Sequence, residues 1–376
     1  MGPLSDWLDA WQDDADTAWA HFDREWAWVR RLAECPQDPV HHAEGNVWIH
    51  TRMVLEELVR SEAFASLDRR GQEVCFAACL LHDIAKPWTT RQEGGRVTAR
   101  GHSAAGAVAA RGWLYEQGVH PSDREAICAI VLRHQLPFFA VEDDDGERRT
   151  ALASWGSPSR WLAAVNEADG RGRVCDDPVR IQDNVDLFRV MADELGCLDQ
   201  PYPFANPTAR FRCARREGTR HDVPPEHFDG TCFVMSGLPG AGKDHWIRTH
   251  QPDLPMVSLD ALRAELGVDP REPQGPVAAA AREQARVHLR KGQDFVWNAT
   301  NVTRQHRQRI VDLAVDYRFR VVLVQVEAPL RRLVEQNRRR PDRVPDGVIT
   351  ALIRKWQFAE PTEAHEVLLA TGADAD

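Results

Sequence analysis

The sequence predicts a two-domain protein, in which an all-α domain is followed by an α/β domain whose parallel sheet is flanked by helices. Three observations support this fold class. The chain of 376 residues is long enough for two domains. Apolar residues recur at helical spacing through residues 1–185. From Thr231 onward, short apolar runs alternate with helical stretches, a pattern typical of a parallel sheet covered by helices.

The N-terminal domain, residues 1–185, shows helical periodicity most clearly in four stretches. They are Trp48–Val59, Val74–Ala85, Ser103–Tyr115 and Arg124–Leu132. We expect Pro87 and Pro137 each to end a helix. No stretch of this domain shows convincing strand alternation.

Residues 186–228 differ in composition from both flanks. The segment DQPYPFANPTARFRC contains three prolines and VPPEHFDG contains two more, so we expect a connector here. Residues 229–376 then form the second domain. Its expected strands are residues 231–236, 253–259, 295–300 and 320–326.

The composition is that of an ordinary globular protein, with 43% hydrophobic and 28% charged residues. No apolar run approaches the ~20 residues that cross a bilayer, and the acidic N-terminus does not resemble a targeting signal. A net charge of −10 argues against indiscriminate nucleic-acid binding but permits a local basic groove. Eight cysteines without a CxxC pair lead us to expect reduced thiols and a cytoplasmic location.

The strongest motif is a glycine-rich loop with the sequence GLPGAGK. It fits GxxxxGK, follows an expected strand and precedes a helix-like segment. Backbone N–H groups of such a loop cradle nucleotide phosphates, so Gly237, Gly240 and Gly242 are candidate nucleotide-binding residues. Lys243 would reach the β- and γ-phosphates. Asp244 stands where this motif usually has a Mg²⁺-binding Ser or Thr, and a carboxylate can also hold Mg²⁺.

Polar side chains follow the next two expected strands. Asp260 could accept a proton from an attacking hydroxyl, or could merely cap the helix that follows. Arg263, three residues later, could hold an acceptor phosphate. After the third strand, Arg304 and Arg307 could serve the same purpose or form a solvated helix face. The candidate acceptor-binding residues are therefore Arg263, Asn298, Thr300, Asn301 and Arg304.

The segment from Arg331 to Arg343 contains six arginines against two acids and is interrupted by a proline. An arginine-rich segment that closes over a triphosphate would neutralise the charge that develops in phosphoryl transfer. A basic surface helix without a catalytic role is the alternative. The candidate donor-binding residues here are Arg338, Arg340 and Arg343.

Together, the elements from about Thr231 to Leu369 resemble the phage-type polynucleotide kinase family. The GxxxxGK loop, the SxDxxR element, the NATN strand end and the arginine-rich segment running into Val-Pro occur in the same order. The resemblance implies a 5′-hydroxyl kinase that uses ATP or another NTP with Mg²⁺. It further implies that Asp260 is the general base and that Arg263 contacts the acceptor end. Arg340 or Arg343, and also Arg338, would be the lid arginines, which contact the donor phosphates from the segment that closes over them.

Histidines and aspartates of the N-terminal domain form a second candidate site. The dipeptide His82-Asp83 ends an apolar helical run, and His50 and Asp169 lie in other expected helices. His102 and His134 flank further helices. Histidine with aspartate suits Mn²⁺, Co²⁺, Ni²⁺ or Fe²⁺ better than an all-oxygen Mg²⁺ site, and a bound metal lowers the pKa of its water.

Two cations stand close to these ligands in the sequence. Lys86 follows Asp83 by three residues and Arg173 follows Asp169 by four, so each could neutralise a phosphate. Lys86 and Lys243 are two of only four lysines in the chain. A single histidine is usually structural, and we expect no functional role for His41 and His42.

The set His50, His82, Asp83 and Asp169 resembles the H…HD…D signature of the HD phosphohydrolase superfamily, which is all-helical. Followed by a kinase module, it resembles the HD–polynucleotide kinase family of bifunctional end-healing enzymes over almost the whole chain. That resemblance implies a Mn²⁺-, Ni²⁺- or Co²⁺-dependent opening of a 2′,3′-cyclic phosphate and removal of the remaining monoester. The implied partners are RNA or DNA ends, an NTP and, functionally, an RNA ligase, with no membrane.

Two alternatives from other classes remain at this point. In one, a nucleotide phosphohydrolase is fused to a small-molecule or nucleoside kinase. In the other, the metal site is degenerate and the helical domain serves a kinase as an RNA-binding platform. The first predicts activity on mononucleotides and none on strands, and the second predicts no bound transition metal.

Overall fold

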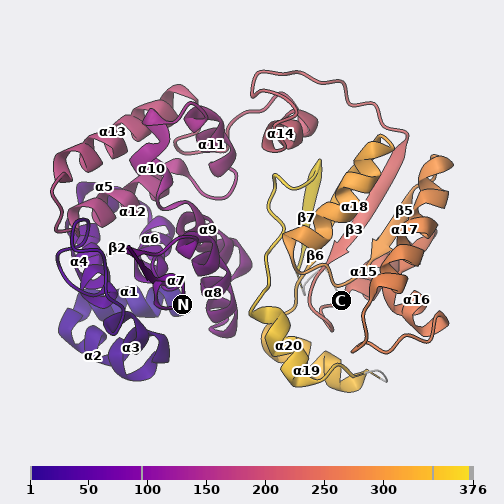
Figure 1. Ribbon diagram of the computed structural model, residues 1–376, viewed down its shortest axis with the longest axis horizontal. Coiled ribbons are helices and arrows are strands. Elements are labelled where there is room, and N and C mark those ends of the chain that lie inside the picture. The colour runs from indigo at the N-terminus through magenta and orange to yellow at the C-terminus, as the bar shows by residue number, and fades with distance from the viewer. Residues whose placement is uncertain (1, 95, 341–342, 372–376) are drawn as a thin grey trace. The chain divides into compact units, whose positions relative to one another are not determined.

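The computed structural model describes residues 2–94, 96–340 and 343–371, and the chain divides into two compact units between Pro203 and Phe204 (Figure 1). This division falls inside the segment 186–228 that was expected to be a connector. Residues up to Pro203 pack with the helical unit, and those from Phe204 onward pack with the α/β unit. No helix among the described residues is long and apolar enough to cross a membrane.

The first unit is helical, as the periodicity of its sequence predicts. Its helices are α1 (Pro3–Asp13), α2 (Ala15–Glu25), α3 (Ala27–Ala33), α4 (Val47–Arg60), α5 (Glu62–Ala65), α6 (Arg69–Leu81), α7 (Lys86–Thr89), α8 (His102–Glu116), α9 (Pro121–Arg133), α10 (Leu136–Phe139), α11 (Gly146–Ala153), α12 (Ser159–Arg171) and α13 (Pro178–Glu194). Helix α13 crosses residue 185, the expected end of the domain.

Helix α6 forms the centre of this unit. Every residue from Val74 to Leu81 is buried, and the helix contacts α1, α4, α9 and α12. A helix that is apolar on all faces is stable only when other helices cover it on all sides. Because α4, α9 and α12 also carry candidate ligands, packing around α6 brings those ligands toward its C-terminal end.

Three local expectations for this unit were wrong. Helix α6 ends at Leu81, so His82 and Asp83 lie in the turn after it. Pro87 and Pro137 stand in the first turns of the short helices α7 and α10, where a missing N–H is tolerated, and do not end helices. Strands β1 (Arg91–Glu93) and β2 (Arg96–Thr98) form a short antiparallel hairpin that shows no alternation in sequence.

The second unit is built on a five-stranded parallel sheet with the order β4-β5-β3-β6-β7. The strands are β3 (Gly230–Ser236), β4 (Met256–Ser258), β5 (Phe295–Asn298), β6 (Phe319–Val326) and β7 (Glu366–Ala370). Strand β7 was not expected, because as an edge strand it leaves Leu368 and Leu369 partly exposed and shows no clear pattern. The helices are α14 (Pro207–Ala214), α15 (Lys243–His250), α16 (Leu259–Glu265), α17 (Gly275–Arg290), α18 (Arg304–Asp316), α19 (Leu330–Arg339) and α20 (Asp346–Ile353).

The carboxyl ends of three neighbouring strands meet at one edge of this sheet. Ser258 of β4 pairs with Asn298 of β5, and β5 pairs in turn with β3, which ends at Ser236. Ligands of open α/β sheets bind at this edge. The glycine-rich loop, Asp260 and the residues after Asn298 all follow these strand ends, so the sheet alone brings three sequence motifs together.

Arg307 of α18 is fully buried and ties α18 to the segment before β7. Its guanidinium donates to both carboxylate oxygens of Glu363 at 2.8 Å and to the carbonyl of Gln357 at 2.7 Å. Its role is therefore structural, and neither the acceptor-binding nor the solvated-face interpretation applies to it.

We predict that Arg307→Ala lowers the free energy of unfolding of the second unit by about 3–5 kcal/mol, because it leaves the buried Glu363 carboxylate without its partner. Denaturant titration would measure the change. Arg320→Ala is the matched control, since Arg320 pairs with Glu366 at 2.6 Å on the surface, where a pair contributes about 0–1 kcal/mol. Equal losses in the two variants would contradict the prediction.

Candidate active sites

Four histidines and two aspartates from separate segments of the helical unit converge on one place. Helix α4, the turn after α6, the start of α8, the residue after α9 and helix α12 each contribute. All six side chains are at most 8% exposed. They are the candidate metal ligands His50, His82, Asp83, His102, His134 and Asp169.

Every one of the four imidazoles is oriented by a backbone carbonyl. The Nδ1 atoms of His50, His82, His102 and His134 donate to the carbonyls of Gly172, Cys79, Ala99 and Val131, at 3.1, 2.6, 2.8 and 2.8 Å. A ring whose Nδ1 carries the proton presents a lone pair at Nε2. A hydrogen bond from the ring nitrogen that does not face the metal is the usual way in which a metal-binding histidine is held.

The Nε2 atoms face one another. Those of His50 and His82 are 3.3 Å apart, and those of His102 and His134 are 3.1 Å apart. Lone pairs at these separations repel unless a cation lies between them. Two ligand clusters result, His50 with His82 and Asp169, and His102 with His134 and Asp83.

Asp83 joins the two clusters. Its Oδ2 is 3.2 Å from His82 Nε2, and its Oδ1 is 3.5 Å from His102 Nε2. Lys86 Nζ approaches Oδ2 to 2.7 Å, yet neither buried oxygen has a partner in hydrogen-bond geometry among the described residues. A buried carboxylate without such a partner is costly, and a divalent cation would satisfy it. The donor set therefore fits one or two divalent cations.

For Asp83, Asp169 and His134, electrostatics and burial favour the protonation states that a metal requires. At His50, by contrast, burial is outweighed by Asp169 and Glu44, which raise its pKa. Burial acts to raise the pKa of Asp83, but Lys86 and His82 outweigh it and lower that pKa well below its usual range. Burial also acts to raise the pKa of Asp169. Arg173 and His50 outweigh it, so this pKa too lies well below its usual range. Burial lowers the pKa of His134 to about 3. Both carboxylates are thus ionised and His134 is neutral at neutral pH.

A pocket of about 400 Å³ opens beside these ligands, and both expected phosphate-neutralising residues line it. They are Lys86 and Arg173, the latter paired to both oxygens of Asp169 at 2.9 and 2.6 Å. His41 and His42, for which we expected no role, also line the pocket. The loop that carries them has no periodic pattern, so only the packing of that loop against the site could reveal their position.

The glycine-rich loop of the second unit lies between β3 and α15. Its backbone conformation and the space around it require glycine. Gly237 has φ +156°, and a Cβ there would lie 2.4 Å from the carbonyl oxygen of Val326. Gly240 and Gly242 have φ of +82° and +104°. Lys243 Nζ donates to the carbonyls of Gly237 and Leu238 at 3.0 and 3.2 Å.

Lys243 is surrounded by charges that matter for phosphate binding. Burial lowers its pKa to about 8, against the opposing effects of Asp244 and Asp260, and the charge of Arg340 acts in the same direction as burial. These Coulomb interactions place Asp260 and Arg340 within electrostatic reach of Lys243. The expected base and the expected lid arginine Arg340 thus both influence the pKa of the loop lysine.

The residues after β5 brace the loop. Asn298 Nδ2 donates to Asp244 Oδ1 at 2.7 Å, and the backbone N–H of Gly237 donates to the carbonyl of Thr300 at 3.0 Å. Asn301 Nδ2 donates to the carbonyl of Met235 at 2.8 Å. The NATN element thus fixes the loop, while Thr300 and Asn301 also line a neighbouring pocket.

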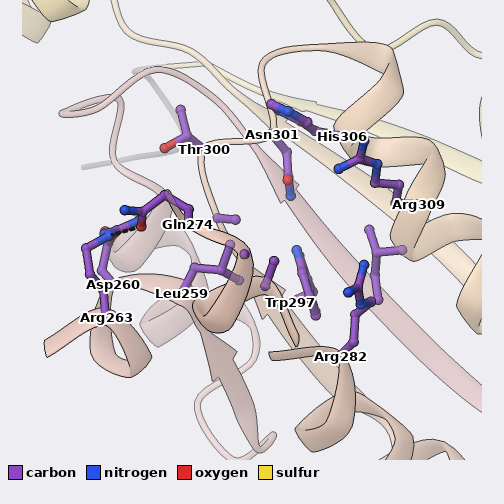
Figure 2. Close-up of a pocket in the computed structure, with 14 residues that line it drawn as sticks. Leu259, Asp260, Arg263, Gln274, Arg282, Trp297, Thr300, Asn301, His306 and Arg309 are labelled. Atoms are coloured by element: carbon purple, nitrogen blue, oxygen red, sulfur yellow. Dashed lines mark hydrogen bonds and ion pairs between the residues drawn. The ribbon is translucent and has the colours of Figure 1, made fainter. Parts of the chain in front are cut away.

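That neighbouring pocket, of about 430 Å³, contains the expected base (Figure 2). Asp260 is paired with Arg263, which also donates to Gln274 Oε1 at 2.7 Å. Four lining residues were not predicted from the sequence: Trp297 on β5, Arg282 on α17, and His306 and Arg309 on α18. Arg304 does not line it, and its guanidinium lies 3.8 Å from Glu360.

The three lid candidates have different environments. Arg340 is half-buried near Lys243, Arg343 pairs with Asp346 at 2.9 Å, and Arg338 is exposed on α19. Asn337 is fully buried and exchanges two hydrogen bonds with the backbone of Val344, at 2.7 and 3.1 Å. These bonds fix both ends of the Arg338–Arg343 segment.

Comparison with known proteins supports the two units separately. The HD domain family matches residues 47–154, and an AAA domain family matches residues 233–359. No curated protein matches the chain significantly. One similar solved structure, from Chloroflexus aurantiacus J-10-fl and described as "a putative kinase", is 20% identical, covering 38% of this chain and 88% of that chain, with a TM-score of 0.32.

The matches and the two sites define a class of protein. A helical domain that matches the HD domain family precedes an α/β domain that matches an AAA domain family and carries a GxxxxGK loop. The His/Asp clusters of the first could hold a divalent metal, and the loop of the second has the form that binds nucleotide phosphates.

We predict that the protein binds Mn²⁺, Ni²⁺ or Co²⁺ and that Asp83→Asn weakens this binding at least ten-fold, because Asp83 faces both clusters. Calorimetric titration of the metal-stripped protein would measure the affinity. Asp38→Asn is the matched control, since Asp38 lines the same pocket outside the clusters. Unchanged affinity in Asp83→Asn would contradict the assignment.

We also predict that nucleoside triphosphate affinity falls as the pH rises above about 8. Lys243, with a pKa of about 8, is protonated below that pH and increasingly neutral above it. A bound triphosphate favours the charged form, so binding at pH 8.5 should take up a proton. Calorimetry in two buffers of different ionisation enthalpy measures this uptake. Lys243→Arg should abolish it, and equal uptake in that variant would argue against Lys243 as the source.

Proposed function

We propose that this protein is a bifunctional nucleic-acid end-healing enzyme. Its P-loop unit phosphorylates 5′-hydroxyl ends of polynucleotides with an NTP. Its helical unit opens the 2′,3′-cyclic phosphate of an RNA end and then removes the remaining monoester. The observation that carries the proposal is an arginine-lined pocket that contains Asp260 together with Thr300 and Asn301 of the segment that braces the glycine-rich loop.

Asp260 suits the role of base toward the acceptor hydroxyl. Its carboxylate is 77% exposed at the pocket, and Arg263 holds it in position. As the hydroxyl oxygen bonds to the γ-phosphorus, its proton passes to Asp260 and the bond to the β-phosphate oxygen breaks, releasing an NDP. Lys243 and Arg340 stabilise the charge that develops on the phosphoryl oxygens.

The metal of the kinase site would be held by Asp244. Its carboxylate lies directly after the loop lysine and is oriented by Asn298 at 2.7 Å. Bound Mg²⁺ there would offset the negative charge of the donor phosphates. Asn298 therefore has a positioning role, unlike the direct acceptor contact that the sequence suggested.

The helical unit supplies a hydrolytic site of matching chemistry. The two clusters around Asp83 would hold the divalent metal, which lowers the pKa of a bound water and polarises a phosphoryl oxygen. Lys86 and Arg173 line the same pocket and neutralise the substrate phosphate. The same residues serve both hydrolyses, since each substrate presents a phosphate ester to the same cations.

The products of the two sites define what must follow. Healing leaves a 5′-phosphate on one fragment and free hydroxyls on the other, which are the ends that a nucleic-acid ligase seals. We therefore place an RNA ligase after this protein in the reaction sequence. The cytoplasm, where thiols stay reduced, is the compartment we propose for it.

A nucleotide phosphohydrolase joined to a small-molecule kinase is the second candidate. The two pockets measure about 400 and 430 Å³, a size that suits a single nucleotide. A helical platform with a degenerate metal site is disfavoured, because all six ligand side chains converge.

We predict that Asp83→Ala abolishes processing of the 2′,3′-cyclic phosphate and spares 5′ phosphorylation, and that Lys243→Ala does the reverse. A short RNA with a 5′-hydroxyl and a 2′,3′-cyclic phosphate, incubated with ATP, Mg²⁺ and Mn²⁺, Ni²⁺ or Co²⁺, would be resolved by electrophoresis. Asp260→Asn should reduce 5′ phosphorylation at least a hundred-fold, the usual contribution of a general base.

Processing of free mononucleotides without processing of either strand end would reject the end-healing proposal in favour of the second candidate. Loss of both activities in a single variant would reject the assignment of each activity to its own unit.

A further inference from the structure

The loop before α4 places a buried carboxylate behind one of the candidate metal ligands. The side chain of Glu44 is 2% exposed, and Glu44 is not among the six candidate ligands. Its Oε1 accepts a hydrogen bond from His42 Nδ1 at 2.8 Å and lies 2.9 Å from His50 Nδ1. Its Oε2 accepts from the backbone N–H of Val174 at 3.1 Å. The carboxylate therefore lies on the Nδ1 side of His50, whereas the Nε2 side faces the ligand clusters.

The proton on His50 Nδ1 has two acceptors within reach. It is donated to the carbonyl of Gly172 at 3.1 Å, and Glu44 Oε1 is as close to the same nitrogen. A carboxylate behind a ligating imidazole fixes the orientation of the ring and makes its other nitrogen a stronger metal ligand. His42, Glu44 and His50 also have the spacing of a metal site, but the protonated Nδ1 of His50 offers no lone pair to a cation there.

Gln37 of the same loop connects this carboxylate with the lysine of the site. Its Nε2 donates to Glu44 Oε1 at 3.4 Å, and its Oε1 accepts from Lys86 Nζ at 2.6 Å. Gln37 is 8% exposed and lines the pocket beside the clusters. Because Lys86 Nζ also pairs with Asp83 Oδ2 at 2.7 Å, these two contacts together fix the position of its charge.

Among the described residues, the groups that contact the Glu44 carboxylate are all N–H donors. They are the rings of His42 and His50, the side-chain amide of Gln37 and the backbone of Val174. A carboxylate accepts at both oxygens, whereas an amide in its place would turn an NH₂ group toward one of these donors. Burial acts to raise the pKa of Glu44, but the hydrogen bonds from His42 and His50 outweigh it and lower that pKa. The surroundings of this side chain therefore favour an ionised carboxylate.

We propose that Glu44 is a positioning residue that acts on both functions of the helical unit's site. It holds His50 toward the metal and, through Gln37, holds Lys86 where the substrate phosphate binds. This inference rests on the metal site of the proposed hydrolysis, but it does not depend on which phosphate ester is hydrolysed. A loop anchor without this role would contribute to the stability of the fold and to neither binding function.

Two variants of similar size to the wild-type side chains separate the two effects. The full-length protein carries Lys243→Ala throughout, so that the glycine-rich loop does not bind the phosphate probe. Calorimetric titration of Mn²⁺ into the metal-stripped protein measures the affinity of the sites that Asp83→Asn weakens. We expect Glu44→Gln to lower this affinity about ten-fold or more, the usual effect of losing a group that orients a ligand. Gln37→Met should leave it unchanged.

Inorganic phosphate is the second probe, titrated into the protein at saturating Mn²⁺. We expect Gln37→Met to raise the dissociation constant for phosphate about three-fold to ten-fold, because the charge of Lys86 stays but its fixed position is lost. Glu44→Gln should weaken phosphate binding as well, since it disturbs the contact that holds Gln37. Glu57→Gln is the matched control and should retain both affinities, because Glu57 lies on α4 with His50 but pairs with Arg60 at 3.6 Å on the surface.

Equal Mn²⁺ affinity in Glu44→Gln and Glu57→Gln would overturn the role of Glu44 behind His50, and unchanged phosphate binding in Gln37→Met would overturn the link to Lys86. Circular dichroism checks the folding of each variant. If Glu44→Gln does not fold, Gln37→Met decides the proposal, and unchanged phosphate binding there rejects it. The expected differences among the variants, in a protein that leaves RNA ends unprocessed, would uphold this inference and reject the proposed function.

Discussion

The carboxylate of Asp83 is buried among the metal-ligand imidazoles without a partner in hydrogen-bond geometry among the described residues, and the helical unit is arranged around that charge. Lys86 pairs with one of its oxygens at 2.7 Å, and a divalent cation held between the clusters would satisfy the carboxylate further. Backbone carbonyls fix the Nδ1 side of each surrounding imidazole, as at His82, which leaves every Nε2 atom to face inward. A divalent metal held by these atoms would therefore stabilise the fold of the helices around α6.

The α/β unit has the opposite electrostatic arrangement. Where the helical unit gathers lone pairs for a cation, the carboxyl edge of the parallel sheet gathers donors and positive charge for phosphates. Gly237 and Gly242 let the loop expose its backbone N–H groups, and Lys243, whose pKa burial lowers to about 8, still carries its charge at neutral pH. Although the net charge of the chain is −10, each of the two pockets is lined by three cationic side chains.

Three arginines of α18 have different environments, although they lie close together in the sequence. Arg304 is exposed and lies 3.8 Å from Glu360, Arg307 is buried against Glu363, and Arg309 lines the pocket beside Asp260 without a partner among the described residues. All three lie within six residues of one helix. Successive turns of a helix face different neighbours, so burial and the available carboxylates decide whether each arginine stabilises the fold or remains free for a ligand.

The sequence by itself determined the fold class, the strands that flank the glycine-rich loop and the contiguous loop motif, because periodicity and local motifs depend on residues close in the chain. It also gave the ligand types of the metal site. Only the tertiary structure decided the end of α6 at Leu81, the edge strand β7, the face-to-face Nε2 atoms and the joining of Arg282 and Arg309 in one pocket. Each of these features depends on segments that are distant in sequence and meet only when the core packs.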